Sequence, residues 1–387
     1  MALQLRRTVI ELPGPAANTT ALQAPVKKQS RRNIAIDILR GYCIVMMIAG
    51  HTGSDTWVNN SIHMLRFVSG AEGFVFLSGL VLGMVYLRKL NAAPANIAYR
   101  ALWKRAGLIW TVHCTLVVLA VALNTSVLHF SDIPNISTIG IPRFLWLTAI
   151  LKFQPGHLLN ILPMYVIFLT ATPVALELMR KGKTAWFAAA SVGTFVYCQF
   201  NPAFGQWVDP ICGGDAFPVT AWQALFFSGM IIGFYHAPLK NMFLQPNRKL
   251  LMWSLGTACL ALAIFVSVQS PSFQFYNHER WDLFLWERHP LRFGRVLYFL
   301  LAVSAFYLLV QKWWYSLPAF RAPLEVLAVL GRNSLYTFLL HLVIAFALDA
   351  VYISPNRQIL LEMIPLASIA TVYMMARYQV ARPWIPN

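Results

Sequence analysis

Residues 34–54 read IAIDILRGYCIVMMIAGHTGS, an apolar run that carries three ionisable side chains, Asp37, Arg40 and His51. Such a run predicts a membrane-spanning helix, in which buried charge costs free energy and usually serves function. On a helix Arg40 lies about 60° and His51 about 40° behind Asp37, so all three project from one face. Arg40 and His51 are roughly 16 Å apart along the axis. This face therefore points into protein and extends well across the bilayer.

The composition places the chain among membrane proteins. Of its 387 residues, 58% are hydrophobic and only 12% are charged, which is too apolar for a soluble domain. The net charge of +17 comes mainly from Lys and Arg between apolar stretches, as membrane orientation requires, so we expect a lipid bilayer and no nucleic acid as partner. The five Cys residues are scattered without metal-type spacing, and we expect no metal site.

Apolar segments recur along the chain and predict an all-α polytopic membrane protein with about ten transmembrane helices. We expect these helices at residues 34–54, 70–88, 106–128, 158–179, 185–200, 218–236, 250–269, 295–311, 326–348 and 359–376. The apolar piece Phe144–Leu151 is too short to span and is expected to lie in the interface or to re-enter the membrane.

The distribution of basic residues indicates the orientation. If the N-terminus is cytoplasmic, 21 of the 31 Lys and Arg residues fall on cytoplasmic segments and 8 on outer loops, Arg295 among the latter. This predicts that both termini are cytoplasmic. We therefore divide the chain into a basic lead predicted to be disordered (1–33), a transmembrane domain (34–377) and a cytoplasmic tail (378–387).

The outer loop at 270–294 mixes aromatic and charged side chains, including Tyr276, Trp281 and Trp286. Aromatic faces beside hydrogen-bonding groups suit a sugar, but the same composition is typical of an interfacial aromatic belt. Both interpretations stay open.

A further ionisable residue, Glu72, opens the second predicted span. On a helix Gly79 and Gly83 share its face within roughly 20°, which predicts a seam of small residues where another helix comes close. Because this span begins outside, Glu72 is expected at the depth of His51. The two could form an acid/base or orienting pair.

The cytoplasmic end of the bundle carries Arg40, and Arg100, Lys104 and Arg105 lead into the third span. Clustered cations suit a phosphate, as in coenzyme A or a lipid head group, although Arg100 and Lys104 also simply retain a loop inside. We add Arg332 and His341 of the ninth span as candidate substrate-binding residues. The run from Arg332 to Ser334 is equally compatible with a capped helix start.

At these residues the sequence resembles the OpgC group of membrane acyltransferases, within the broader acyltransferase-3 superfamily. The spacing of ten residues between Arg40 and His51 is a loose motif by itself. Together with the run from Ala71 to Gly79 in the second span it is fairly specific. The matching pieces are Asp37-Ile38-Leu39-Arg40-Gly41, His51, Ala71-Glu72-Gly73-Phe74-Val75-Phe76-Leu77-Ser78-Gly79, Ile161-Leu162-Pro163-Met164-Tyr165, Ala221-Trp222-Gln223 with Gly229, and Leu330-Gly331-Arg332-Asn333-Ser334-Leu335 with His341.

The resemblance implies a multi-pass enzyme of the bacterial inner membrane, which in the named case transfers succinyl groups to periplasmic glucans. The family's Arg and His map onto Arg40 and His51, and its acidic position in the second helix maps onto Glu72. The superfamily's paired Arg motif is met only loosely by Arg100 and Arg105, which are five residues apart.

We predict O-acyl transfer from a cytoplasmic acyl-CoA, with succinyl-CoA as one candidate, to a periplasmic carbohydrate hydroxyl, without a bound cofactor. His51 is the expected general base, and Glu72 would hold its tautomer or charge. Arg40 and Arg105 would bind donor phosphate or stabilise negative charge, and Asp37 would orient Arg40. A relay through an acyl-histidine is an alternative.

Two other classes of function remain. A transporter or flippase would use the charged face of the first span as a path, but the chain lacks an internal repeat and its apolar runs look continuous. A structural scaffold would leave the buried Asp37, Arg40 and Glu72 without a role.

Overall fold

The structure is a computed structural model of the chain. The predicted lead up to residue 32, most of the aromatic loop at 270–294, and residues 381–387 of the predicted tail lie outside the described residues. The described residues are 33–63, 65, 67–126, 139–153, 158–208, 217–243, 246–269, 285–287, 291–316, 318–349 and 358–380.

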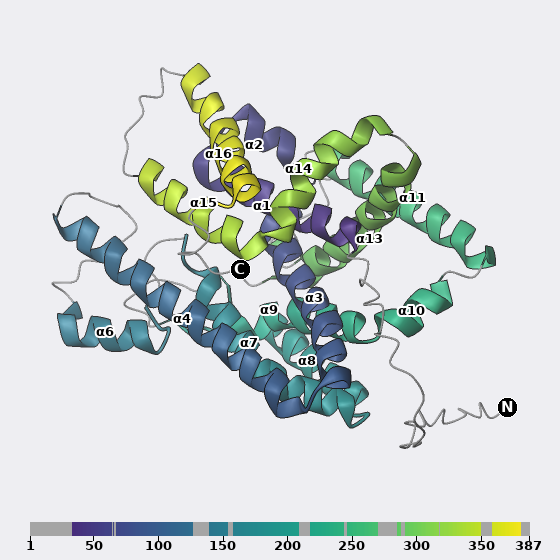
Figure 1. The fold of residues 1–387 in the computed structure, drawn as a ribbon, viewed down its shortest axis with the longest axis horizontal. Coiled ribbons are helices and arrows are strands. Elements are labelled where there is room, and N and C mark those ends of the chain that lie inside the picture. The colour runs from purple at the N-terminus through teal and green to yellow at the C-terminus, as the bar shows by residue number, and fades with distance from the viewer. Residues whose placement is uncertain are drawn as a thin grey trace, which may run out of the picture. The chain divides into compact units, whose positions relative to one another are not determined.

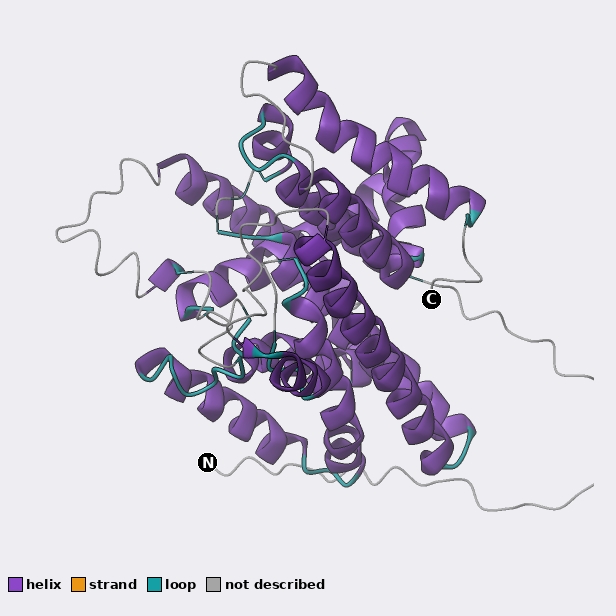
Figure 2. Cartoon of the chain, turned by 90° about the vertical axis from the view of Figure 1, so that its left-hand side faces the viewer, coloured by secondary structure: helices purple, strands orange, loops and turns teal. Residues whose placement is uncertain are grey.

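The described residues form helices and loops and no strand (Figures 1 and 2). The elements are α1 (Ile34–Thr52), α2 (Trp57–Ile62), α3 (Gly70–Ala92), α4 (Ala95–Ser126), α6 (Ile141–Ala149), α7 (Ile161–Arg180), α8 (Thr184–Phe200), α9 (Val219–Phe234), α10 (His236–Phe243), α11 (Pro246–Gln269), α13 (Phe293–Ser316), the 3-10 turn η2 (Pro318–Phe320), α14 (Arg321–Arg332), α15 (Ser334–Asp349) and α16 (Gln358–Tyr378).

Six of these helices are long and apolar enough to cross a membrane, namely α1, α3, α4, α7, α13 and α16. The bent pair α14 and α15 would make a seventh crossing, and α9 and part of α11 are shorter apolar helices. The expected class, an all-α membrane protein, is confirmed for the described residues. The count of ten spans and the cytoplasmic placement of both termini stay predictions.

The ninth predicted span, residues 326–348, is wrong as a single straight helix. The chain breaks at Asn333, and α14 and α15 meet at an angle of 89°. Asn333 turns its side-chain amide back to the carbonyl oxygen of Val329 at 3.0 Å, which occupies a carbonyl at the end of α14. Gly331 lies so close to α1 that a Cβ there would overlap the backbone oxygen of Asp37. Packing against α1 therefore interrupts a segment that hydropathy predicts to be continuous.

Helix α1 is the most enclosed of the long helices. In its most apolar window 78% of the residues are buried, compared with 22% in α16. It contacts α2, α3, α13, α14, α15 and α16. A Cβ at Gly41 would overlap the carbonyl oxygen of Leu327, so α1 and α14 touch backbone to backbone. The charged face of α1 is thus turned toward protein, as the sequence predicts.

Helices α3 and α9 form a second close contact (Figure 1). A Cβ at Gly79 or Gly83 would overlap the backbone of α9, and one at Gly229 or Gly233 would overlap the backbone of α3. Each helix therefore contributes two glycines, four positions apart, to one seam. This confirms the predicted small-residue seam of the second span and identifies α9 as the helix that packs on it.

Candidate active site

Arg40 is buried on α1 and reaches the start of α15. Its Nη2 donates a hydrogen bond to the hydroxyl of Ser334, the first residue of α15. Both residues are buried, and a buried guanidinium is tolerated only where such partners are available. Ser334 stands at a helix start because a small hydroxyl side chain suits that position. Arg40 therefore links the middle of α1 to the bend between α14 and α15.

Asp37 lies one turn before Arg40 and also faces the bent pair. Its carboxylate is 3.8 Å from Nε of Arg332, and Arg332 donates a second bond of 3.1 Å to Glu325. Asp37 thus forms an ion pair that holds α14 against α1. Its expected role in orienting Arg40 stays a prediction. Arg332, expected to bind substrate, has its charge between two carboxylates, and its substrate role stays a prediction.

His51, near the end of α1, forms a pair with His341 of α15. Nδ1 of His51 lies 3.1 Å from Nε2 of His341, and the two rings are nearly parallel with centroids 5.3 Å apart. His341 is fully buried, and its Nδ1 contacts the carbonyl oxygen of Phe338. The structure thereby brings together two histidines that are 290 positions apart in sequence.

These contacts assign the tautomers of both rings. A carbonyl oxygen only accepts hydrogen bonds, so Nδ1 of His341 carries a hydrogen. In its neutral form His341 then has a lone pair on Nε2, and Nδ1 of His51 must donate to it. The lone pair of neutral His51 is consequently on Nε2. A histidine held in one tautomer by a second group is the arrangement that general-base catalysis uses.

Glu72 is fully buried at the start of α3, but its partner is not His51. One carboxylate oxygen accepts from the backbone N–H of Ser69 at 2.8 Å and from the Ser69 hydroxyl, and the other accepts from Nε of Arg295. The predicted pairing of Glu72 with His51 is therefore wrong in this structure. Arg295, assigned to an outer loop from the charge count, lies within α13 and is buried. A buried carboxylate needs a cation, and the third residue of α13 supplies it.

A family model described as "OpgC protein" matches residues 32–384, nearly the whole chain. The chain belongs to the OpgC family. No curated protein and no solved structure matches it. Membership of the OpgC family indicates a membrane acyltransferase that modifies glucans, and the resemblance drawn from motifs along the chain is confirmed.

The three cations that precede the third predicted span differ in their relation to the rest of the bundle. Arg100, Lys104 and Arg105 are all exposed on α4. Arg105 interacts electrostatically with the hydroxyls of Tyr86 and Tyr165, and Arg40 acts on Tyr165 as well. Arg40 and Arg105, on different helices, thus both act electrostatically on the buried hydroxyl of Tyr165. Of the three, Arg105 is the one that the structure relates to α1.

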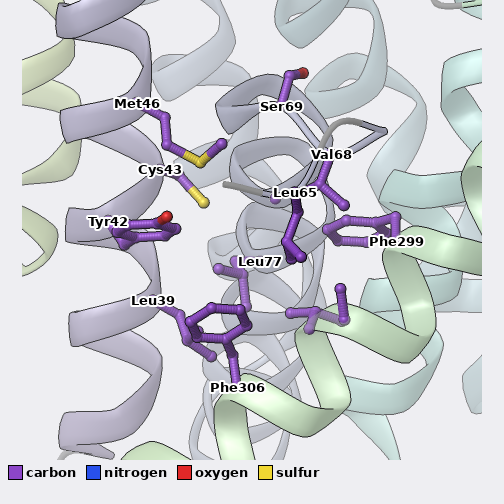
Figure 3. A pocket seen from close by; sticks show the side chains of 13 residues that line it. Leu39, Tyr42, Cys43, Met46, Leu65, Val68, Ser69, Leu77, Phe299 and Phe306 are labelled. Atoms are coloured by element: carbon purple, nitrogen blue, oxygen red, sulfur yellow. The ribbon is translucent and has the colours of Figure 1, made fainter. Parts of the chain in front are cut away.

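An apolar pocket lies on another side of α1, facing α3 and α13 (Figure 3). Cys43 and Met46 of α1 point into it opposite Phe299 and Phe306 of α13. The Tyr42 hydroxyl in its wall donates to the carbonyl oxygen of Ile62 at 2.6 Å. Such a lining suits hydrocarbon rather than sugar or phosphate, so this pocket is not the polar site of an OpgC enzyme.

Three features of this site are missed by sequence reasoning. These are the His51–His341 pair, the Glu72–Arg295 pair, and the role of Ser334 as partner of Arg40. One signal was available for Arg295, because a buried Glu at one helix start requires a cation at the same depth. Among the described residues, no three His, Cys, Asp or Glu side chains gather as metal ligands.

Proposed function

We propose that this OpgC-family protein is an O-acyltransferase of the bacterial inner membrane that uses an acyl-CoA, with succinyl-CoA as one candidate. The acceptor in this proposal is a hydroxyl of a periplasmic glucan or a related envelope carbohydrate. The family match supports acyl transfer to glucan. The observation that carries the chemistry is the chain from the Phe338 carbonyl through His341 to His51, because it presents a basic nitrogen on the membrane-spanning helix α1.

In the proposed reaction, Nε2 of His51 takes the proton of the acceptor hydroxyl as the oxygen attacks the thioester carbonyl carbon. A carbon–oxygen bond forms, and the tetrahedral intermediate collapses by breaking the carbon–sulfur bond. His51 then returns its proton to the departing thiolate, which leaves as coenzyme A. His341 stays neutral and accepts a hydrogen bond from the Nδ1–H group of His51 throughout. This hydrogen bond stabilises the imidazolium form of His51.

Arg40 would act at the other end of the donor. It lies roughly 16 Å from His51 along α1, which is too far to touch the reacting carbonyl. An extended pantetheine arm covers such a distance, so in this proposal Arg40, together with Arg105 of α4, binds the phosphate end. This favours donor binding over oxyanion stabilisation, the two roles that the sequence leaves open for Arg40.

Glu72 takes a different role from the predicted one. Since Ser69 and Arg295 occupy its carboxylate, we assign Glu72 to anchoring α3 against α13 rather than to fixing His51. His341 takes over the orienting function that the sequence assigned to Glu72. Asp37 likewise supports the site through α14.

The proposal is tested by mass spectrometry of envelope glycans from cells that lack the gene, cells that carry it, and cells with His51→Ala. We expect an acyl mass that is lost in the deletion and in His51→Ala, since neither has the base. A matched control is His236→Ala, because His236 is also a half-buried helix-end histidine, with its ring 2.9 Å from a carbonyl oxygen. Full acylation with His51→Ala would overturn the mechanism, and an acyl-histidine trapped with donor alone would replace it by the covalent relay.

A transporter remains the second candidate because of one observation. The sequence argued against transport from unbroken apolar runs, but the structure shows a break at Asn333 beside the Asp37–Arg332 ion pair. Interrupted helices at a charged site are typical of transporters. Labelled acyl donor separates the two: an enzyme leaves the label on carbohydrate, whereas a transporter moves its substrate unchanged.

A further inference from the structure

The apolar pocket of Figure 3 has a buried floor and a half-buried rim. Cys43 and Leu77 of the floor are buried, whereas Tyr42, Val303 and Phe306 of the rim are half-buried. Two of these rim residues belong to α13, whose most apolar window is only 33% buried and therefore faces lipid along much of its surface. The pocket thus opens from the bundle toward the bilayer, on the side of α13.

The pocket lies at the depth where the two leaflets of a bilayer meet. Its wall includes Cys43, which is the midpoint of α1 (Ile34–Thr52), a helix long enough to span the membrane. The hydrocarbon core is about 30 Å thick, so the tails of each leaflet end about 15 Å below its surface, at this midpoint. The mouth of the pocket is continuous with the lipid-facing surface of α13. The group that meets this mouth is therefore the end of a lipid tail.

The hydroxyl groups of the lining have partners within the protein. The hydroxyl of Tyr42 donates to the carbonyl oxygen of Ile62 at 2.6 Å, and the hydroxyl of Ser69 donates to the carboxylate of Glu72. The other lining side chains are hydrocarbon or carry sulfur, and the sulfur of Cys43 points toward the middle of the pocket (Figure 3). A buried water molecule needs about three polar partners, which this lining does not offer. The lining therefore favours hydrocarbon over water.

The size of the cavity limits its ligand to the end of a chain. Its volume is about 40 Å³, whereas an apolar cavity that takes a benzene ring has a volume of roughly 150 Å³. Aromatic contacts hold the walls in place: Tyr42 stacks on Phe306 with ring centroids 5.8 Å apart, and Phe299 packs edge to face with Phe76. A sugar or sterol ring does not fit between such walls, but the last carbons of an alkyl chain do.

We infer that this pocket binds the tail end of a bilayer phospholipid, which enters beside α13 and lies between α1 and α3. The depth, the apolar lining and the size of the pocket agree on this ligand. A bound tail fills a gap beside α1, the helix that carries Arg40 and His51, and so supports the position of that helix. The inference is independent of the proposed acyl transfer, because the tail is not a substrate and contacts a different side of α1.

Photocrosslinking of the full-length protein in phospholipid nanodiscs tests the site. A phosphatidylcholine with a diazirine at the end of one tail should label Cys43 and Met46, which are buried in the bundle and line the pocket. A matched phosphatidylcholine with the diazirine next to the ester carbonyl should not label them, because its reactive group stays near the membrane surface. Peptide mass spectrometry locates the labels. Labels confined to exposed positions, such as Ser304 of α13, would overturn the site.

Two variants close the pocket in different ways. Ala302→Val adds two methyl groups inside it, and Val303→Phe narrows its mouth. Each should lower the labelling of Cys43 about tenfold, the ratio expected when two methylene groups lose their burial. The variants change different parts of the pocket, so one remains informative if the other fails to fold. Ser304→Val, at an exposed position of the same helix, is the matched control and should leave the labelling unchanged.

The outcomes separate this inference from the proposed enzyme. Labelling of the His51→Ala protein should equal that of the wild type, whatever happens to acylation. Unchanged labelling of Cys43 in both pocket variants would overturn the inference. So would loss of the label on adding a long-chain acyl-CoA but not on adding unlabelled phospholipid, because the pocket would then belong to an acyl donor.

Discussion

Four ionisable side chains of α1 and α3 each meet a partner from another helix. Asp37 meets Arg332, Arg40 meets Ser334, Glu72 meets Arg295, and His51 meets His341. Each partner comes from a helix distant in sequence, so the same contacts that satisfy the polar groups also fix the helices. The His51–His341 pair differs from the two ion pairs, Asp37–Arg332 and Glu72–Arg295, because both of its members can be neutral and one nitrogen of His51 is then basic. That difference makes it the centre of the proposed chemistry.

At this scale we predict that His341 acts on catalysis through His51. His341→Leu removes the acceptor for the Nδ1 hydrogen of His51 and should lower kcat by about 100-fold with little change in the KM of either substrate. His341→Gln places an amide oxygen near the former Nε2 and should recover much of the rate. Steady-state kinetics with purified protein give both values. Equal rates for the Leu and Gln variants would show that His341 has only a packing role.

We also predict that removing one partner of the Glu72–Arg295 pair destabilises the protein far more than replacing both partners. Glu72→Gln leaves Arg295 buried without a counter-charge and should cost about 3–5 kcal/mol of unfolding free energy. Replacing both residues by Leu should cost clearly less. The comparison is Glu177→Gln, which breaks an exposed pair with Arg180 (3.0 Å) and should cost about 1 kcal/mol or less. Thermal unfolding in detergent measures all three, and similar losses throughout would contradict the argument.

Among the elements, the α1–α14 and α3–α9 pairs are in close backbone contact, and they serve different parts of the site. The α1–α14 contact brings Arg332 to Asp37 and places α15 so that His341 reaches His51. The α3–α9 contact holds α3, whose first turn carries Glu72. Glycine makes both contacts possible because any side chain at these positions would separate the backbones. The site is thus assembled by helix packing rather than by loops.

We predict that the α3–α9 seam does not tolerate larger residues. Gly79→Val would push its side chain into the backbone of Phe226 and Met230 and should lower stability by about 3 kcal/mol or prevent stable expression. Gly107→Val on α4 is the control, because a Cβ there meets no atom within 4 Å and the helix loses only propensity. Expression level and unfolding temperature in detergent give the result. Equal behaviour of the two variants would refute the seam.

For the whole molecule, the orientation of the chain in the membrane decides which side supplies the acyl donor and which side supplies the acceptor. The proposal requires the Arg40 end of α1 at the cytoplasm and the His51 end outside. The excess of Lys and Arg on one set of connecting segments favours this orientation. Family membership supports it indirectly, since glucan modification needs acceptor access. The orientation is independent of every contact described above and therefore needs a test of its own.

We predict that a cysteine replacing Ser54, exposed just after α1, is labelled by a membrane-impermeant thiol reagent in intact spheroplasts. A cysteine replacing Lys183, exposed between α7 and α8, should react only after the membrane is permeabilised. Both substitutions belong in a background from which the native cysteines have been removed. The reverse labelling pattern would mean that the chain has the opposite orientation and that the proposed donor and acceptor sides are exchanged.

The sequence by itself determined the membrane class, the position of most helices, the single charged face of α1, and the small-residue seam of α3. These follow from hydropathy and from helical periodicity, both of which are local properties. Only the tertiary structure decided which groups pair: Arg295 rather than His51 for Glu72, His341 for His51, and the break at Asn333 within the ninth predicted span. Periodicity fixes the face of one helix but not the neighbour it meets. That choice depends on packing between residues hundreds of positions apart.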